Sequence, residues 1–99
     1  ESALKIQPEH VNHLGNYGNA LSDLARIKED EILFNKAFEQ FEKALKIKPD
    51  DFNSLNNYGV ALSNLAIIKQ DKVLLDKAFK HFKKAYKMHV VWTKKLNRS

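Results

Sequence analysis

The sequence has no cysteine, only three glycines and two prolines among its 99 residues, and no long apolar run. The absence of cysteine excludes disulfide frameworks, thiolate zinc sites and cysteine nucleophiles. Scarce glycine and proline, with 43% hydrophobic and 29% charged residues, are typical of one folded domain. The longest apolar stretches, such as residues 73–75, are far shorter than the roughly 20 residues that span a bilayer. We therefore expect no membrane span and a soluble, cytoplasmic protein.

The formal net charge of +5 is distributed unevenly along the chain. Residues 1–49 hold seven Lys and Arg against eight Asp and Glu, a balance of −1, and residues 50–99 hold ten against four, a balance of +6. A basic half attracts nucleic acid, an anionic lipid surface or an acidic protein. Composition alone does not choose among these partners.

An internal repeat organises the chain. Residues 3–43 match residues 44–84 at 24 of 41 positions, and the Asn-Tyr-Gly of residues 16–18 recurs at residues 57–59. A fixed period of this kind indicates that one supersecondary unit is repeated and stacked on itself.

Each repeat unit contains two apolar stripes with steps of three or four residues, which is the spacing of amphipathic helices. Asp30, Asp50 and Asp71 precede stripes and are expected as N-caps, and Pro49 is expected to end the second stripe. The pattern predicts four helices, near residues 9–27, 30–47, 50–68 and 71–89.

The apolar positions of each unit resemble the tetratricopeptide repeat family. In the second unit the matching positions are Leu55, Tyr58, Gly59, Leu62, Ala78, Phe82 and Ala85. The period of 41 residues exceeds the family's usual 34 by about two helical turns, so the resemblance implies a long-repeat variant. It also implies an all-α fold of helix-turn-helix hairpins stacked as an α-solenoid, a fragment of a superhelix.

We interpret the whole chain as a single domain of this kind. Residues 1–8 are read as the tail of a preceding repeat, 9–49 as repeat 1, 50–89 as repeat 2 and 90–99 as a C-terminal extension or capping segment. We expect the sequence to be part of a longer array, because solenoids usually need about three units. Either the last helix is prolonged and Trp92 covers the terminal apolar face, or Trp92 docks a partner, or the tail is disordered.

Polar side chains on the first helix of each unit are the binding candidates, since first helices line the concave groove of such a stack. These residues are Asn12, Asn16, Asn19, Asp23, Asn53, Asn57 and Asn64. Asparagine both donates and accepts hydrogen bonds, which predicts a groove that binds the main chain of an extended peptide. The alternative is that these asparagines only solvate a helix face.

The Asn-Tyr-Gly spacing is similar to the asparagine ladder of the protein O-linked acetylglucosaminyl transferase superhelix, and that resemblance implies that Asn16 and Asn57 are its rungs. A second use of the family is a clamp for the C-terminal carboxylate of chaperones. Its cations are missing here, because the corresponding positions are Gly15, Asn19, Asn56 and Val60. The sequence therefore predicts a non-enzymatic scaffold with a protein or peptide partner and no small-molecule substrate.

Four lysines share one face of the last predicted helix and form what we call the basic ridge. They are Lys80, Lys83, Lys84 and Lys87. These lysines either form a solvated helix face or bind nucleic acid or an anionic surface electrostatically, which is an alternative function. The stacking aromatics and recognisable module of a nucleic-acid binder are missing. A third possibility is a structural spacer that forms homo-oligomers through the open ends of the solenoid.

Catalysis has no support in the sequence. His10 and His13 have the spacing of a helical pair, but no third ligand is placed to complete a metal site. No nucleophile motif surrounds Ser22, Ser54 or Ser63. We predict no catalytic residue, no metal and no cofactor.

Overall fold

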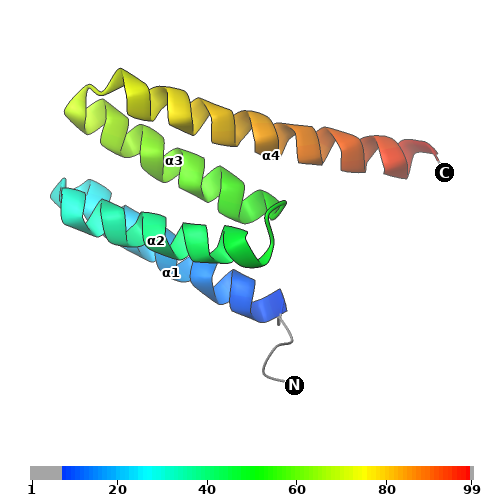
Figure 1. The fold of residues 1–99 in the computed structure, drawn as a ribbon, viewed down its shortest axis with the longest axis horizontal. Coiled ribbons are helices and arrows are strands. Elements are labelled where there is room, and N and C mark those ends of the chain that lie inside the picture. Colours follow the sequence, from blue (N-terminus) through cyan, green and yellow to red (C-terminus); the bar gives the residue numbers. More distant parts are fainter. Residues whose placement is uncertain (1–7, 99) are drawn as a thin grey trace.

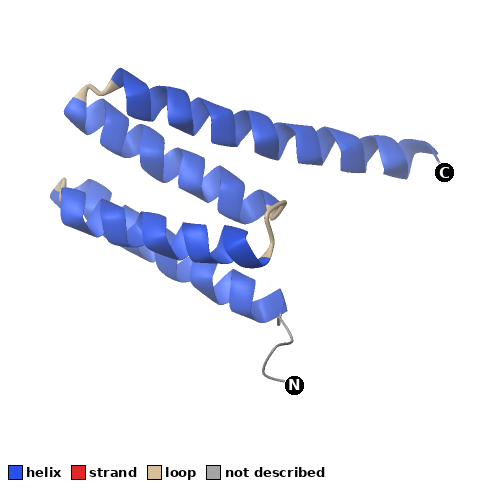
Figure 2. Cartoon of the chain, in the orientation of Figure 1, coloured by secondary structure: helices blue, strands red, loops and turns tan. Residues whose placement is uncertain are grey.

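The four apolar stripes fold into four α-helices, which Figures 1 and 2 show stacked in two hairpins. The computed structural model describes the backbone of residues 8–98 and the side chains of residues 10–87. The helices are α1 (Pro8–Lys28), α2 (Glu31–Ile47), α3 (Phe52–Lys69) and α4 (Lys72–Arg98). The all-α hairpin architecture predicted from the sequence is confirmed, and over the described residues there is no strand. None of these helices combines the length and apolar character needed to cross a membrane.

The turn between α1 and α2 closes one helix and opens the next within two residues. Glu29 adopts a left-handed conformation (φ 53°), and the Asp30 amide donates to the Ala25 carbonyl across 3.0 Å, as in a Schellman motif. The Asp30 carboxylate then accepts from the Ile32 amide at 2.9 Å. Asp30 is thus the N-cap of α2, as predicted.

The turn between α3 and α4 repeats this geometry 41 residues later. Gln70 is left-handed (φ 54°, ψ 45°), the Asp71 amide donates to the Ala66 carbonyl at 2.9 Å, and the Asp71 carboxylate accepts from the Val73 amide at 3.0 Å. The prediction of Asp71 as a cap is confirmed. Both hairpins are therefore closed by the same two-residue connection.

Gln70→Gly is expected to raise the free energy of unfolding by up to about 1 kcal/mol. A left-handed conformation costs a side-chain-bearing residue roughly 1–2 kcal/mol, and glycine returns only part of that as extra unfolded-state entropy. Lys43→Gly, at an exposed position inside α2, is the control and should lower stability by about 1 kcal/mol. Urea unfolding measures both, and a loss of stability in Gln70→Gly would contradict the expected release of strain.

The predicted cap at Asp50 is wrong. Asp51 caps α3 instead, because its carboxylate accepts from the Ser54 amide at 2.9 Å and from the Ser54 hydroxyl at 2.6 Å. The Asp51 amide donates to the Lys48 carbonyl at 3.1 Å, so Pro49 and Asp50 occupy the centre of a turn. Proline favours the first central position of such a turn, which moves the cap one residue further along.

The last helix continues past residue 89 to Arg98, which agrees with the prolonged last helix that was one of the predicted alternatives. The sequence has Val90 where the first unit has Pro49, and valine, unlike proline, allows a helix to continue. Residues 90–98 therefore prolong α4. The side chain of Trp92 lies outside the described side chains.

The helices pack in chain order, with α1 against α2, α3 against α4, and α3 also against α2 and α1. Within the described part of the chain, no Cα atom of α4 comes within 8 Å of one in α1 or α2. The main core lies between α2 and α3, where Phe41, Tyr58 and Leu62 are buried. Because the backbone of α4 approaches only that of α3 closely, the opposite side of α4 forms one edge of the stack (Figure 1).

Two glycines allow the helices of each hairpin to approach closely. A Cβ atom on Gly18 would stand 2.9 Å from the Phe41 ring, and one on Gly59 would stand 2.8 Å from the Phe82 ring. Contacts this short force the ring to move. Each glycine is thus required by the aromatic residue on the second helix of its own hairpin.

Candidate functional site

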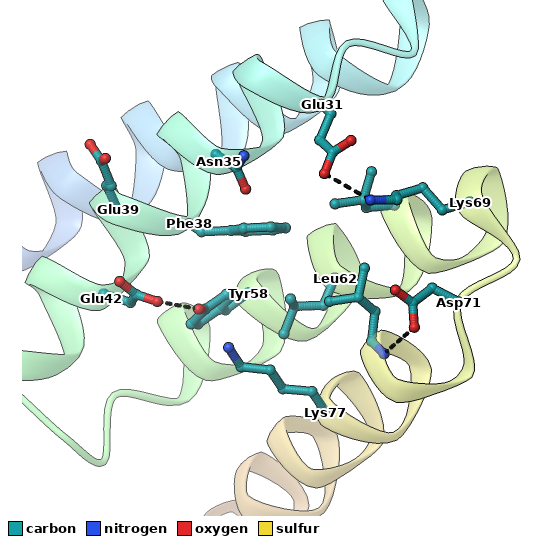
Figure 3. A pocket seen from close by; sticks show the side chains of 12 residues that line it. Glu31, Asn35, Phe38, Glu39, Glu42, Tyr58, Leu62, Lys69, Asp71 and Lys77 are labelled. Carbon is teal, nitrogen blue, oxygen red and sulfur yellow. Dashed lines mark hydrogen bonds and ion pairs between the residues drawn. The ribbon is translucent and has the colours of Figure 1, made fainter.

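A groove of about 480 Å³ lies between α2 and α4, with α3 as its floor (Figure 3). It exists because α2 and α4 both pack on α3 without approaching one another closely. Glu31, Asn35, Glu39 and Glu42 line it from α2, and Leu74 and Lys77 line it from α4. We call this space the inter-helix groove.

Tyr58 occupies the floor of the inter-helix groove. Its ring is 3% exposed and lies 5.4 Å from the Phe38 ring, 5.7 Å from Phe41 and 4.5 Å from His81, measured between centroids. The Tyr58 hydroxyl donates to Glu42 Oε2 at 2.5 Å. Tyr58 thereby joins the two hairpins through both its ring and its hydroxyl.

The pKa of the Tyr58 hydroxyl is raised well above its usual value. Burial is the main cause, and the hydrogen bond to Glu42 and the negative charge of that carboxylate add to it. The phenol therefore stays protonated at physiological pH and remains a donor to Glu42. It is a structural donor and not a general base.

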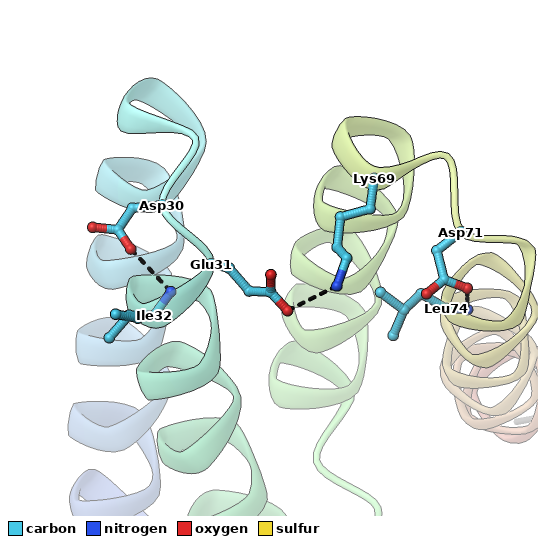
Figure 4. A network of polar contacts seen from close by, with 6 residues as sticks. All are labelled: Asp30, Glu31, Ile32, Lys69, Asp71 and Leu74. Carbon is cyan, nitrogen blue, oxygen red and sulfur yellow. Dashed lines mark hydrogen bonds and ion pairs between the residues drawn. The ribbon is translucent and has the colours of Figure 1, made fainter.

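Charged side chains line the rim of the groove. Lys77 Nζ lies 5.7 Å from the centroid of the Tyr58 ring, within cation–π range. At the turn end, Lys69 Nζ pairs with Glu31 Oε2 at 2.9 Å (Figure 4), and this contact raises the pKa of Lys69. Both partners are exposed to solvent, so the pair contributes little to the free energy of unfolding. It joins α2 to α3 at the end of the groove.

Sequence reasoning missed this groove. It placed Tyr58 in an apolar stripe, but it had no means to pair Tyr58 with Glu42, which belongs to the other hairpin. One signal was present in the repeat, because Glu42 corresponds to Lys83 in the second unit. A charge reversal at equivalent positions indicates that the two units meet different neighbours.

The seven predicted polar residues, which we call the asparagine face, lie elsewhere. Asn12, Asn16, Asn19, Asp23 and Asn53 are exposed and Asn57 and Asn64 are half-buried. On α1 each of them directly follows a buried residue of the stripe Val11, Gly15, Gly18 and Ser22. None of the seven lines the inter-helix groove, so the asparagine face and the groove are separate surfaces.

The two halves of the asparagine face occupy equivalent positions on neighbouring helices. Asn16 and Asn57 are 41 residues apart, and α1 contacts α3. The helices approach at Gly15, where an added Cβ atom would stand 3.7 Å from the Ser54 hydroxyl. Equivalent residues of the two hairpins therefore lie on helices that contact one another.

The four lysines of the basic ridge are all exposed. Lys80 and Lys84 border a hollow of about 310 Å³ near Pro49, between the end of α2 and α4. Lys83 Nζ lies 5.6 Å from the Phe79 ring centroid, in cation–π range. Lys80 and Lys84 therefore lie beside this hollow, and Lys83 lies beside Phe79.

His10 and His13 are both exposed on α1. Among the described side chains, no group of three His, Asp or Glu residues is arranged to hold a metal ion.

Residues 40–72, which run from α2 through all of α3 to the first residue of α4, match a family model described as a tetratricopeptide repeat. No curated protein and no solved structure matches the chain. The four helices packed as two repeated hairpins agree with this match, so the chain has an all-α fold similar to that of tetratricopeptide repeats.

Proposed function

We propose that the chain binds an extended segment of a partner protein along the asparagine face. One observation carries the proposal: polar side chains that follow one another at helical spacing remain accessible on α1 and α3, directly beside a buried stripe. They continue from one hairpin to the next, because Asn12, Asn16 and Asp23 have counterparts in Asn53, Asn57 and Asn64. A ligand that crosses the stack meets the same chemistry in each hairpin.

The amide side chain suits recognition of a peptide backbone. Each asparagine offers a carbonyl oxygen to a ligand N–H and an amino group to a ligand C=O. A row of asparagines therefore holds the main chain while leaving the ligand side chains largely unread. The helices hold these groups in place before binding, so the ordering cost falls mainly on the ligand.

The length of the unit fits the same interpretation. We take the 41-residue period as a long variant of the family repeat, and the first helices of 21 and 18 residues support this. Longer first helices carry more polar positions per hairpin. The surface offered to an extended ligand is correspondingly wider.

Asn16→Ala combined with Asn57→Ala is expected to weaken peptide binding about tenfold, since each lost hydrogen bond is worth roughly 0.5–1.5 kcal/mol. The probe is a peptide selected against the intact chain from a random-sequence phage library, titrated by calorimetry. Lys36→Ala, at an exposed position on α2 outside the inter-helix groove, is the control and should leave the affinity unchanged.

N-methylation of alternate amides in the same peptide supplies a second readout. Methylation removes main-chain donors without changing the side chains, so it should weaken binding to the native chain and have little further effect on the double variant. If the double variant binds the selected peptide with native affinity, the binding site lies elsewhere.

A further inference from the structure

The side of α4 that faces away from α2 carries apolar residues whose equivalents on α2 are buried or half-buried. We call it the outer face, and on α4 it consists of Lys72, Leu75, Phe79, Phe82, Lys83 and Tyr86. Leu75 is 49% exposed, Phe79 62% and Tyr86 68%. In the first hairpin the residue equivalent to Leu75 is Phe34, which is fully buried beneath α3.

Two hollows mark this outer face. One of about 250 Å³ lies near the α3–α4 turn and includes Ala66 and Leu75, and one of about 180 Å³ includes Ala85 and Tyr86. Leu75 and Tyr86 are 11 positions apart in α4, or about 16 Å along a helix. The hollows therefore lie about three helical turns apart.

The interface inside the molecule shows what fills the equivalent positions. At Ala25 and Phe34, which correspond to Ala66 and Leu75, the side chain of Leu65 packs into place. Tyr58 and Leu62 pack in the neighbouring cluster around Phe41. The first hairpin is thus covered by one helix, α3. Its apolar residues Tyr58, Leu62 and Leu65 stand at positions i, i+4 and i+7.

Charge distinguishes the two surfaces. On α2 the residues beside the interface are Glu31, Asn35, Glu39 and Glu42, and their counterparts on α4 are Lys72, Asp76, Lys80 and Lys83. The four positions carry three negative charges on α2, whereas on α4 they carry three positive charges and one negative charge. Glu31 attracts Lys69 of α3, at position i+11 of the covering helix, whereas Lys72 would repel a lysine at that position.

A second copy of the chain fits the apolar part of the outer face but not its charge. Its helix α1 carries Tyr17, Leu21 and Leu24 at the same i, i+4, i+7 spacing, with Lys28 at i+11. Docking α1 in the way that α3 docks would place Lys28 against Lys72. The ion pair inside the molecule would be replaced by two like charges.

We propose that the outer face binds an acidic amphipathic helix of a partner protein, with apolar residues at i, i+4 and i+7 and a carboxylate at i+11 facing Lys72. The apolar residues fill the space around Phe79 between the two hollows, and Lys83 offers a second cation to the acidic side of the helix. This site shares no residue with the asparagine face. It is a second interaction surface, at the edge of the stack.

The test uses the intact chain and two helix-stabilised peptides with the sequence of residues 52–69. One peptide carries Lys69→Glu, and the other keeps the native lysine. Fluorescence anisotropy at low salt should show the Lys69→Glu peptide binding about fivefold tighter, because one attractive pair replaces a repulsive one. Phe79→Ala in the chain should weaken that binding about tenfold, with the helix content unchanged by circular dichroism.

Charge reversal provides the sharpest comparison. Lys72→Glu in the chain should reverse the order, so that the peptide with native Lys69 becomes the tighter ligand. Lys43→Glu, an exposed lysine on α2, should leave the order as it is. Equal affinities for the two peptides, or no effect of Phe79→Ala, would overturn the proposal. A mass that rises with concentration in sedimentation and falls to the monomer in Phe79→Ala would instead assign the face to a second copy.

Discussion

Tyr58→Ala is expected to lower the free energy of unfolding by about 3–5 kcal/mol, as for other buried aromatic residues, whereas Tyr17→Ala should cost less than about 1 kcal/mol. The two tyrosines are equivalent in the repeat, but Tyr58 is 3% exposed and Tyr17 is 56% exposed. The difference arises because α2 covers Tyr58 from the neighbouring hairpin. The two variants therefore compare one side chain with and without its interface.

Denaturant unfolding followed by circular dichroism measures both variants. Tyr58→Phe serves as the control that keeps the ring, and it should cost only about 1 kcal/mol because Glu42 is exposed and regains water when its donor is lost. Equal losses for Tyr58→Ala and Tyr17→Ala would mean that the second hairpin does not dock on the first.

Gly18→Ala is expected to lower the free energy of unfolding by about 2 kcal/mol, although alanine is the better helix former. The added methyl group would stand 2.9 Å from the Phe41 ring, and Phe41 is fully buried, so the ring has no space to move into. Gly59→Ala makes the same contact with Phe82, which is only half-buried. Its cost should be smaller, because Phe82 can shift toward the outer face.

Gly15→Ala is the matched control on the same helix. Its methyl group would meet the Ser54 hydroxyl at an ordinary 3.7 Å, so the gain in helix propensity should dominate and raise stability by up to about 1 kcal/mol. Thermal and urea unfolding distinguish these opposite signs. A gain of stability in Gly18→Ala would show that Phe41 has room to yield.

The helices could be predicted from the sequence because each one has its own signal. The apolar stripes gave four helices, and Asp30 and Asp71 are caps because each carboxylate follows a helix end and precedes a stripe. The prediction of Asp50 as the N-cap of α3 was wrong. Two adjacent aspartates follow Pro49, and only the turn geometry decides which of their carboxylates reaches the Ser54 amide.

The candidate sites were less predictable, because they depend on which copy of a repeated residue is covered. Tyr17 and Tyr58 have the same place in the local sequence pattern. They differ in solvent exposure only because α2 covers Tyr58 once the hairpins have docked. The bond between Tyr58 and Glu42 links residues of different hairpins, which no helical period records. The asparagine face was accessible to sequence reasoning because its residues lie at regular steps on single helices.

The serial order of packing has a mechanical consequence. The two hairpins are joined mainly through α3, and over the described residues no Cα atom of α1 or α2 lies within 8 Å of one in α4. A pulling force applied to the two termini would therefore act in series on the α3–α4 contact and on the contacts of α3 with the first hairpin. The weaker link should open first and leave the remaining hairpin folded, so that extension proceeds in steps.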